Sequence, residues 1–582
     1  MIEKDEVLLK SSNEWCHFKN PHCIISATSV DNVRKALQDV ERLVNSNNWH
    51  AAGFVSYEAA PAFDHALRVR NAADFPLMWF GLYSEPRVVK TAEVFLNASK
   101  LGSLGSPKWQ PTVERESYNT AIEKIKDYIA RGRTYQVNYT MRLNSEFNGK
   151  EWDFFLNLAQ SQNKYAAYID TGRYVICSAS PELFFKLDGD KIYSRPMKGT
   201  VKRGRTTRED IEQAEWLYHS TKNRAENVMI VDMLRNDLGR IAEIGSVHVP
   251  ELFTVEKYPT LFQMTSTVQA RTKASLTEIF SALFPCASIT GAPKVSTMKI
   301  ISELETTPRK IYTGSIGYIS PNRKAQFNVA IRTALIDKEY KQAEYGLGGG
   351  IVWDSTSEDE YNEALLKSRV LTERPYSLGF SLFETMLWTP KDGYFLLEKH
   401  ILRMADSAEY FDFPFSKEKL EVFLDQTAGR FTSPKRVKVY LNRFGELSEE
   451  TKDFHSEKRL FKGCLANQSI DSNNVLLFHK TTRREIYPAH PNEYDDTLLF
   501  NEKNELTEFT IGNLVVEMDG EFFTPPLACG LLAGTFRAHL LETNQIKERV
   551  IHKNELSKCS RVFLVNSVRK WVEVEIQKEP TL

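Results

Sequence analysis

The chain has 582 residues, of which 42% are hydrophobic and 26% are charged, and its formal net charge is -1. A chain of this length exceeds what one hydrophobic core organises, so we expect two or more domains. The balanced charge creates no overall field for nucleic acid or for an acidic membrane surface, so we expect neither as a partner. The 7 cysteines are scattered and lack CxxC spacing, which argues against a disulfide framework or a zinc site.

The first residues, Met1 to Glu6, lack the basic and apolar regions of a signal peptide. Apolar runs stay well short of the roughly 20 residues that a membrane span needs. These features, together with the unpaired cysteines, predict a cytoplasmic protein without a membrane partner.

Strand patterns predominate early in the chain, as at residues 78–83. Further on, Asp188-Gly189 lies between two apolar runs, residues 183–187 and 191–193, and predicts a hairpin. Residues 208–239 and 357–372 have helical apolar spacing without internal glycine-rich or proline breaks, so we expect helices there.

The best domain boundary lies at residues 373–377, where a proline follows a predicted helix. It predicts a first domain of residues 1–373 and a second of residues 374–582. In the second domain, residues 436–442 alternate as a strand, Asp519-Gly520 predicts a hairpin, and the last strands fall at 562–565 and 572–576. This is the pattern of an α+β domain of about 200 residues with its own core.

Four ordered motifs carry a family resemblance. They are Ser178-Ala179-Ser180-Pro181-Glu182, Arg195-Pro196-Met197-Lys198-Gly199-Thr200, the segment Asn223 to Asp232, and Ser288-Ile289-Thr290-Gly291-Ala292-Pro293-Lys294. Together they resemble the chorismate-utilising enzymes, which include anthranilate, isochorismate, salicylate and aminodeoxychorismate synthases. The resemblance covers residues 50–370 approximately. It implies a large layered α+β domain with two packed antiparallel sheets and outer helices.

Lys198 distinguishes among the members of this family. Those that make anthranilate usually carry a small residue, often alanine, at this position, whereas lysine in the P-x-K-G-T context resembles component I of aminodeoxychorismate synthase. The resemblance implies that the Lys198 amine attacks C2 of chorismate as the C4 hydroxyl leaves, and that ammonia then adds at C4 and expels the lysine. Such an amine must have a lowered pKa. Glu182 matches the general acid that protonates the departing hydroxyl.

The resemblance also implies a magnesium site and a set of substrate contacts. Magnesium is a hard cation that prefers oxygen ligands. Its expected ligands are Glu226 and Glu363, with Glu360 nearby at i and i+3 on one helix face. The matching substrate-binding positions are Thr200, Ser288, Thr290, Gly291, Ala292, Tyr312, Arg332, Gly348, Gly349 and Lys367.

One position departs from the family pattern. Gln263 stands where many relatives have a histidine that is associated with later steps, including pyruvate elimination in anthranilate synthases. A glutamine side chain does not transfer protons in this way. This departure favours a synthase that stops before elimination.

The second domain carries a different resemblance. Phe383-Glu384-Thr385-Met386 and the segment His400 to Ala408 look like the opening of an aminodeoxychorismate lyase, a fold-type IV pyridoxal phosphate enzyme. The resemblance implies that Lys480 is the Schiff-base lysine and that Glu508 faces the pyridine nitrogen. It also implies that Arg403 and the turn before a helix bind the phosphate. The cofactor-binding residues it implies are Arg403, Lys480, Glu508, Asn513, Gly534 and Thr535.

Taken together, the two resemblances imply a bifunctional enzyme that makes 4-aminobenzoate from chorismate for folate synthesis. We find no glutaminase-like cysteine nucleophile, so ammonia is expected from a separate glutamine amidotransferase subunit or from solution. Alternatives remain for both domains. The first is also compatible with an anthranilate or isochorismate synthase, and the second with an aminotransferase or a non-catalytic module.

Overall fold

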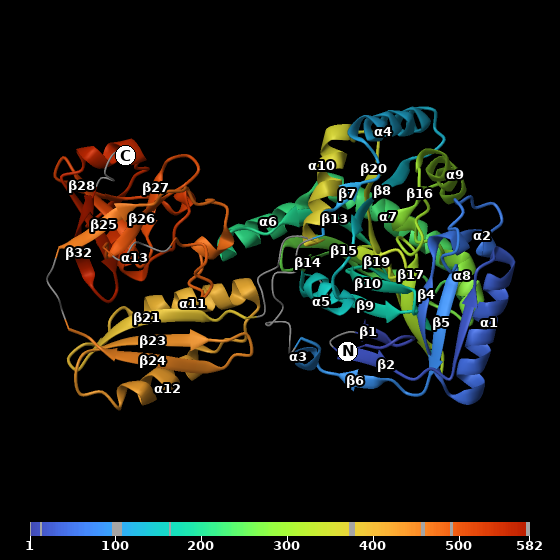
Figure 1. The fold of residues 1–582 in the computed structure, drawn as a ribbon, viewed down its shortest axis with the longest axis horizontal. Helices are drawn as coiled ribbons and strands as arrows, with labels where there is room; N and C mark the ends of the chain where they lie inside the picture. The colour runs from blue at the N-terminus through green and yellow to red at the C-terminus, as the bar shows by residue number, and fades with distance from the viewer. Residues whose placement is uncertain are drawn as a thin grey trace. The chain divides into compact units, whose positions relative to one another are not determined.

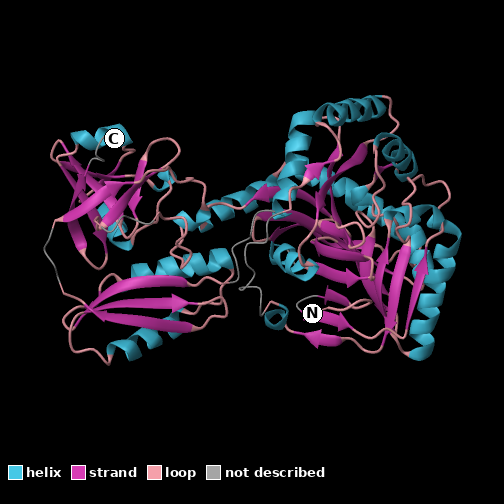
Figure 2. Cartoon of the chain, in the orientation of Figure 1, coloured by secondary structure: helices cyan, strands magenta, loops and turns pink. Residues whose placement is uncertain are grey.

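A computed structural model describes residues 2–11, 14–95, 107–161, 164–371, 379–455, 460–488 and 493–577. The chain forms two compact units (Figures 1 and 2). The first comprises Met1–Lys202 and Ala214–Ser377, and the second comprises Arg203–Gln213 and Leu378–Leu582. The boundary predicted at residues 373–377 lies outside the described residues.

The first unit contains two large sheets whose paired strands all run antiparallel. The described strands of one sheet follow the order β16 (Gly291–Ala292), β8 (Gln136–Glu146), β20 (Gln342–Ile351), β19 (Thr333–Asp337), β10 (Tyr174–Ser180), β9 (Tyr165–Asp170), β1 (Val7–Ser11), β2 (Glu14–Phe18) and β6 (Arg87–Val89), with β7 (Gln110–Pro111) beside β8.

The second sheet of this unit holds the strand that carries Lys198. Its described order is β13 (Met197–Lys202), β15 (Leu261–Arg271), β12 (Lys191–Arg195), β11 (Leu183–Asp188), β18 (Lys324–Val329), β17 (Ser315–Ser320), β4 (His50–Val55), β5 (Met78–Tyr83) and β3 (Cys23–Ala27), with β14 (His248–Lys257) beside β15. The predicted hairpin is confirmed, because β11 pairs with β12 and Gly189 takes a positive φ of 63° in the turn.

Helices surround these sheets (Figure 2). Those of the first unit are α1 (Val30–Asn47), α2 (Ala60–Phe63), α3 (Thr91–Val94), α4 (Arg115–Ala130), α5 (Glu151–Ser161), α7 (Thr221–Gly239), α8 (Leu276–Leu283), α9 (Lys294–Leu304) and α10 (Ser357–Ser368). The expected helix over 208–239 is two helices, because α6 (Thr207–His219) ends before Ser220 caps α7 by accepting from the Asn223 amide. One apolar cluster joins both sheets with α1, α7 and α8, so these elements share a core.

The second unit combines a small sheet with a closed barrel. The sheet has the order β22 (Gly393–Tyr394), β21 (Leu382–Thr389), β23 (Lys435–Leu441) and β24 (Leu447–Asp453), and the helices are α11 (Leu397–Phe411), α12 (Lys417–Ala428) and α13 (Thr535–Glu542). The barrel strands follow the order β27 (Leu506–Phe509), β26 (Asp496–Phe500), β25 (Phe461–Leu465), β32 (Lys570–Gln577), β31 (Arg561–Asn566), β28 (Asn513–Met518), β29 (Glu521–Thr524) and β30 (Lys547–Glu548).

Pairing of β27 with β28 closes this sheet on itself, which removes the free edges of those strands. The ring encloses an apolar cluster that includes Leu498, Phe509, Leu514 and Leu564. The predicted strand at 436–442 is β23, and the hairpin at Asp519-Gly520 joins β28 to β29. The expected α+β fold, with a large two-sheet domain and a smaller second domain, is therefore confirmed.

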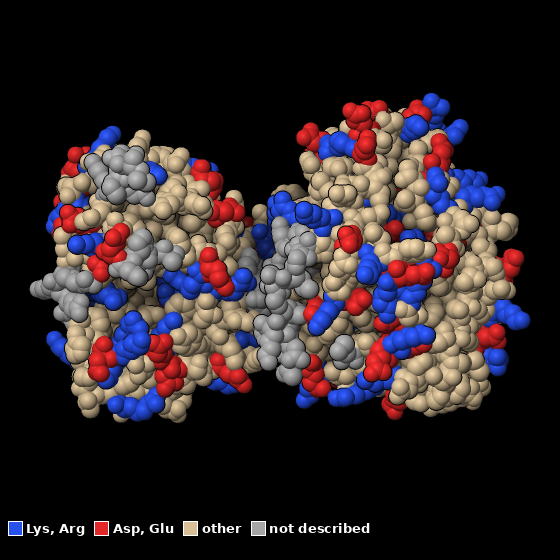
Figure 3. Space-filling view, in the orientation of Figure 1, with Lys and Arg blue, Asp and Glu red and all other residues tan. Residues whose placement is uncertain are grey.

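Both units carry lysine and arginine interspersed with aspartate and glutamate on the face shown in Figure 3. Among the described residues, no helix is both long enough and apolar enough to cross a membrane.

Candidate active sites

Lys198 lies on β13 next to β20 of the other sheet. A Cβ atom added to Gly350 would lie 3.1 Å from the Lys198 amine and 2.1 Å from the Gln136 amide nitrogen. Because Gly350 has no side chain, the Lys198 amine and the Gln136 amide can occupy the space where its Cβ atom would lie. Lys198 is partly exposed, yet burial among protein atoms lowers the pKa of its amine, while the nearby Glu226, Glu182 and Glu363 carboxylates oppose this shift.

Glu182 is buried directly before β11, and its charge acts on the Lys198 amine. Burial raises the pKa of its carboxyl to about 7, although a hydrogen bond from Ser288 and the charge of Lys198 act in the opposite direction. The Ser288 hydroxyl donates to Glu182 Oε1 at 2.6 Å, and it lies 3.3 Å from the Cys286 thiol. A carboxyl with this pKa is partly protonated at neutral pH, as a general acid must be.

The family segment at residues 288–292 contributes mainly backbone shape in this structure. The Thr290 hydroxyl donates to the carbonyls of Cys286 and Ala287 within its own turn. Gly291 has a φ of 134°, and a Cβ there would lie 2.0 Å from the Gln136 carbonyl oxygen. Only glycine fits this position. The turn that it allows brings Ser288 to Glu182, and it places β16, which includes Ala292, against β8.

The carboxylates expected to bind magnesium come from two helices. Glu360 and Glu363 lie on α10; the Glu360 pKa is raised by burial and by the charge of Glu363, whereas Glu363 is paired with Lys367 at 2.8 Å. Glu226 lies on α7 and acts on the same Lys198 amine as Glu363. Among the described residues, no three His, Cys, Asp or Glu side chains converge tightly enough to form a metal site.

These carboxylates nevertheless fit magnesium when a substrate supplies further ligands. Magnesium usually takes one or two protein carboxylates and keeps several waters or substrate oxygens. Burial is the main cause of the raised Glu360 pKa, and the like charge of Glu363 adds to it, so a cation between the two carboxylates would relieve that repulsion.

Cationic side chains and glycines complete the first site. The Arg332 side chain has no hydrogen bond or ion pair with the described residues, its backbone has a φ of 51°, and burial lowers its pKa. The Lys367 ammonium donates to the Gly348 carbonyl at 2.9 Å and would lie 3.7 Å from a Cβ on Gly349. Arg332 is thus a guanidinium available for an anion.

Two expected residues lie at the margins of this arrangement. Thr200 is exposed and pairs across β13 and β15 with Gln263, whose buried Oε1 atom has no hydrogen-bond partner in the described structure. The buried Tyr312 ring leaves no room for a Cβ on Gly346, since the separation would be 2.1 Å. Gln136 was not expected from the sequence. Only its approach to Gly350 and Lys198 in space identifies it.

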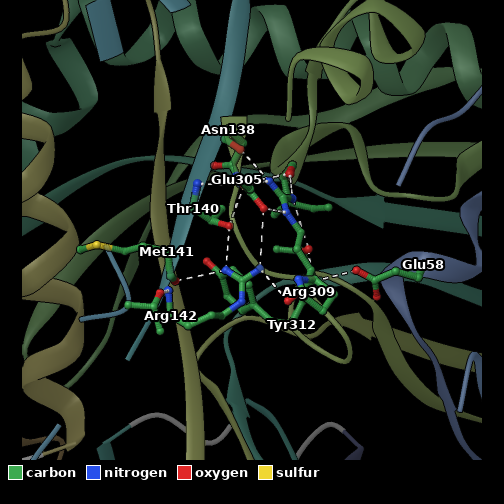
Figure 4. A network of polar contacts seen from close by, with 12 residues as sticks. Glu58, Asn138, Thr140, Met141, Arg142, Glu305, Arg309 and Tyr312 are labelled. Atoms are coloured by element: carbon green, nitrogen blue, oxygen red, sulfur yellow. Dashed lines mark hydrogen bonds and ion pairs between the residues drawn. The ribbon is translucent and has the colours of Figure 1, made fainter. Parts of the chain in front are cut away.

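A buried charged network lies next to Tyr312 (Figure 4). Glu305 accepts from Arg309 at 2.6 Å and from the Thr140 hydroxyl at 2.8 Å, and it lies 3.6 Å from Arg142. The Arg309 backbone amide donates to Glu58 at 2.7 Å. This network ties β8 to the segment after α9, and both support the first site.

In the second unit, Lys480 is a partly exposed lysine beside the small sheet. Its backbone carbonyl accepts from the Phe383 amide, and its amine lies 4.8 Å from the Phe383 ring centroid. Burial and then the Arg403 charge lower the Lys480 pKa to about 7, against the opposing charge of Glu384. Its amine makes no hydrogen bond within the part of the chain that the structure describes, which suits a group that forms a covalent bond.

Glu508 lies at the end of β27 with two side-chain partners. It accepts from the Tyr487 hydroxyl and from the Asn513 amide, each at 3.2 Å. Burial raises its pKa to about 8. A cationic ring nitrogen beside this carboxyl would restore its charged form. A Cβ on Gly534 would lie 1.8 Å from Asn513 Oδ1, so glycine is required where the Asn513 side chain crosses the turn.

Arg403 lies beside the turn that opens α13. It is paired with Glu384, and its Nη1 donates to the Ala533 carbonyl at 3.0 Å. Although burial alone raises the pKa of Glu384, Arg403 and His400 hold it at about 2. Thr535, the first residue of α13, has its hydroxyl 3.3 Å from His400 Nε2. A cation, a hydroxyl and backbone amides at this turn suit a phosphate group.

The lysine, the carboxyl and the phosphate-suited turn are the donor set that pyridoxal phosphate requires, so the residues fit this cofactor. Sequence reasoning missed Tyr487 and the role of Glu384. Tyr487 follows Lys480 closely in the sequence but belongs to no recognised motif, and its signal is the contact with Glu508 in space.

Comparison with known proteins agrees with this division. Residues 4–373 match the family model described as chorismate binding enzyme, and residues 381–576 match the model described as amino-transferase class IV. Aminodeoxychorismate synthase component 1 from Escherichia coli K12 is 42% identical over 269 residues, which are 46% of this chain and 59% of that protein.

The Bacillus subtilis protein of the same name is 41% identical over 256 residues, 44% of this chain and 54% of that protein. The alignments therefore span little more than half of these relatives. Among solved structures, anthranilate synthase component I from Streptococcus pneumoniae TIGR4 has a TM-score of 0.53 at 25% identity, over 64% of this chain and 94% of that one.

Proposed function

The chain belongs to the chorismate-binding enzyme family, and from this premise we propose that it makes 4-aminobenzoate in two steps. The first unit aminates chorismate to 4-amino-4-deoxychorismate, and the second eliminates pyruvate from that product. The observation that carries the proposal is the Lys198 amine, with its lowered pKa, beside Glu182 and two helix carboxylates. The 42% identity to the E. coli protein named aminodeoxychorismate synthase component 1 supports it.

In the first step the unprotonated Lys198 amine attacks C2 of chorismate. The double bond shifts, and the C4 hydroxyl leaves as water with the proton of Glu182. Ammonia then adds at C4 as the double bonds shift back and the C2–N bond breaks, so the protonated adduct nitrogen leaves as the neutral lysine amine. The new C4 ammonium returns one proton to the Glu182 carboxylate. A lysine with lowered pKa and a buried glutamic acid with raised pKa are the two protonation states that this step needs.

The remaining residues of the first site would hold the substrate. Magnesium bound by Glu226 and Glu363, with Glu360 nearby, would supply positive charge to a substrate carboxylate. Arg332 would pair with a carboxylate, since its guanidinium has no partner among the described residues. Backbone around Gly348 and Gly349 is held open by the absence of side chains.

In the second step, pyridoxal phosphate bound through Lys480 would supply an electron sink. Arg403, Gly534 and Thr535 would hold its phosphate, while Glu508, oriented by Tyr487 and Asn513, would hold the ring nitrogen. The freed Lys480 amine would carry protons between the substrate carbon atoms. A Lys480 pKa of about 7 suits transfer in both directions.

Ammonia would come from a partner. The named relatives are components 1 of their enzymes, and this chain carries no recognised glutaminase nucleophile. We therefore propose a separate glutamine amidotransferase subunit. Glutamine-dependent turnover that arises only when such a subunit is added would support it, and failure of every candidate subunit would count against it.

A product assay tests the whole function. Purified protein is given chorismate, magnesium and ammonium, with and without pyridoxal phosphate, and products are identified by mass and chromatography. Appearance of 4-aminobenzoate and pyruvate only with the cofactor supports both steps. Accumulation of 4-amino-4-deoxychorismate in both conditions refutes the second step. Anthranilate as the product would favour the rival function that the Streptococcus pneumoniae likeness represents.

The second unit has its own test. Lysine substitution at position 480 abolishes covalent cofactor attachment, so the visible absorbance of bound pyridoxal phosphate should be lost in Lys480→Ala. Lys503→Ala, an exposed lysine in the same unit, is the matched control. A wild-type protein that never takes up the cofactor would refute the lyase function.

A further inference from the structure

One face of the small sheet in the second unit carries a lysine that no motif singled out. In the β21–β23 pair, Phe383 is opposite Tyr440 and Thr385 is opposite Lys438. Because side chains alternate along a strand, these four residues share one face. The other face carries Glu384 and Val439, both buried, and Glu384 is held there by Arg403 of α11.

The Lys438 ammonium lies close to Lys480 by way of one ring. Its nitrogen is 4.2 Å from the Phe383 ring centroid, and the Lys480 nitrogen is 4.8 Å from the same centroid. The two amines therefore lie no more than about 9 Å apart, the sum of those distances. The amines of Lys480 and Lys438 thus both lie near the Phe383 ring.

Lys438 is not committed to a carboxylate. In the described structure it forms no hydrogen bond or ion pair and rests instead on the rings of Phe383 and Tyr440, the latter at 4.8 Å. Its cross-strand neighbour Glu450 accepts from the Tyr440 hydroxyl at 3.1 Å and pairs with Lys452 at 3.2 Å, whereas the Lys438 charge acts on this carboxylate only from beyond ion-pair distance. The charge is thus available to a ligand.

The proposed substrate carries a carboxylate that can reach Lys438 while its amine lies at the Lys480 end of the site. In 4-amino-4-deoxychorismate the amine on C4 and the carboxylate on C1 are opposite one another on the ring, about 6 Å from nitrogen to carboxyl carbon. The carboxylate oxygens lie about 6.5 Å from that nitrogen, and a charge-assisted hydrogen bond adds up to about 2.8 Å, so this substrate can bridge cations up to about 9 Å apart, which is the upper limit on the separation of the two amines. An α-amino acid instead carries its carboxylate on the carbon that bears the amine, roughly 2.5 Å from the nitrogen.

We propose that Lys438 binds the ring carboxylate of the second site's substrate and so selects amines whose carboxylate lies across a ring. This inference rests on the proposed lyase function. It assigns the choice between a lyase and an α-amino acid aminotransferase to a cation on the sheet rather than to the cofactor-binding residues.

The test compares Lys438→Met with wild type, each saturated with pyridoxal phosphate. The product 4-aminobenzoate keeps the ring carboxylate, whereas aniline has the same amine without it. Loss of one charge-assisted contact should weaken 4-aminobenzoate binding, measured by calorimetry, by about 10- to 100-fold. Aniline should bind both proteins equally. The kcat/KM for 4-amino-4-deoxychorismate should fall by the same factor, with partial recovery in Lys438→Arg.

Lys435→Met is the matched control. Lys435 lies on the same strand but points to the other face, where it pairs with Asp453 at 2.7 Å. This variant should retain wild-type 4-aminobenzoate affinity, and both variants should keep the wild-type cofactor absorbance.

The possible outcomes distinguish a failure of the Lys438 role from a failure of the lyase function. If wild type releases pyruvate and Lys438→Met loses neither turnover nor 4-aminobenzoate affinity, the inference is overturned and the lyase function stands. An equal loss of aniline affinity also overturns it, because the effect is then independent of the carboxylate. A wild type that releases no pyruvate overturns the lyase function, and the inference with it.

Discussion

The Ser288 hydroxyl donates a 2.6 Å hydrogen bond to the carboxyl of Glu182, and both side chains are buried. This contact favours the ionised carboxylate, while burial favours the neutral acid, and burial wins because the pKa is raised to about 7. The Ser288 hydrogen bond is the largest of the contributions that lower the Glu182 pKa, and a single substitution removes it.

Ser288→Ala should therefore raise the Glu182 pKa further. The proposed acid works in its protonated form, so the amination rate in wild type should fall as pH rises through about 7. In Ser288→Ala that decline should move to higher pH. The measurement is the pH profile of kcat/KM for chorismate, with rates referred to the concentration of free ammonia. Ser302→Ala, at a half-buried position on α9, is the control. An unmoved profile in Ser288→Ala would show that Ser288 does not set the pKa of the acid.

Lys198→Ala should lower the amination rate at least 10³-fold, because the covalent route is lost. Wild type incubated with chorismate and magnesium, but without ammonia, should carry added mass on the peptide that contains Lys198. Lys202→Ala, the exposed lysine of the same strand, should retain both the rate and the adduct. Full activity in Lys198→Ala would show that ammonia adds without a lysine intermediate.

Gly350→Ala should damage the first step with little loss of stability. The new methyl group would displace the ends of two flexible side chains, the Gln136 amide and the Lys198 amine, rather than backbone. We expect at least a tenfold fall in amination and a melting temperature near that of wild type. Gly239→Ala is the control, since nothing lies within 4 Å of its added Cβ. Unchanged amination in Gly350→Ala would mean that the two side chains tolerate displacement.

Glu305→Gln should destabilise the first unit. The Glu305 carboxylate compensates Arg309 and Arg142 in a buried network, and removing one partner of such a pair leaves uncompensated charge, at a cost of about 3–5 kcal/mol. Urea unfolding measures this change. Glu303→Gln, an exposed carboxylate in the last turn of α9, should cost under about 1 kcal/mol. Equal midpoints for the two variants would contradict the structural role of the network.

Prediction from the sequence succeeded where information is local. The Asp188-Gly189 hairpin, strand β23 and the helix expected over residues 357–372, whose α-helical part is α10 (Ser357–Ser368), follow from turn chemistry and apolar spacing. The break at Ser220 was missed because the sequence alone does not indicate whether the hydroxyl of a serine inside a helical pattern caps a new helix.

The sites were predictable only in part, because long-range contacts leave no local pattern. Gln136 meets Lys198 across the gap left by Gly350, and these residues come from three different strands. Lys438 meets Lys480 only through Phe383. The proposed ligand roles of Glu226, Glu360 and Glu363, and the contact of Thr200 with substrate, remain predictions.

The second compact unit includes Arg203–Gln213, a stretch that directly follows the strand bearing Lys198. Within that unit the Tyr410 hydroxyl donates to the Gly204 carbonyl at 2.6 Å, and His479, the neighbour of Lys480, lies 3.1 Å from the Arg205 carbonyl. Separating the two activities by cutting the gene at residue 378 would therefore strip the C-terminal piece of an internal part. A split version would also have to be redesigned at Arg203–Gln213, which includes the first half of α6, so one cut does not separate the two units.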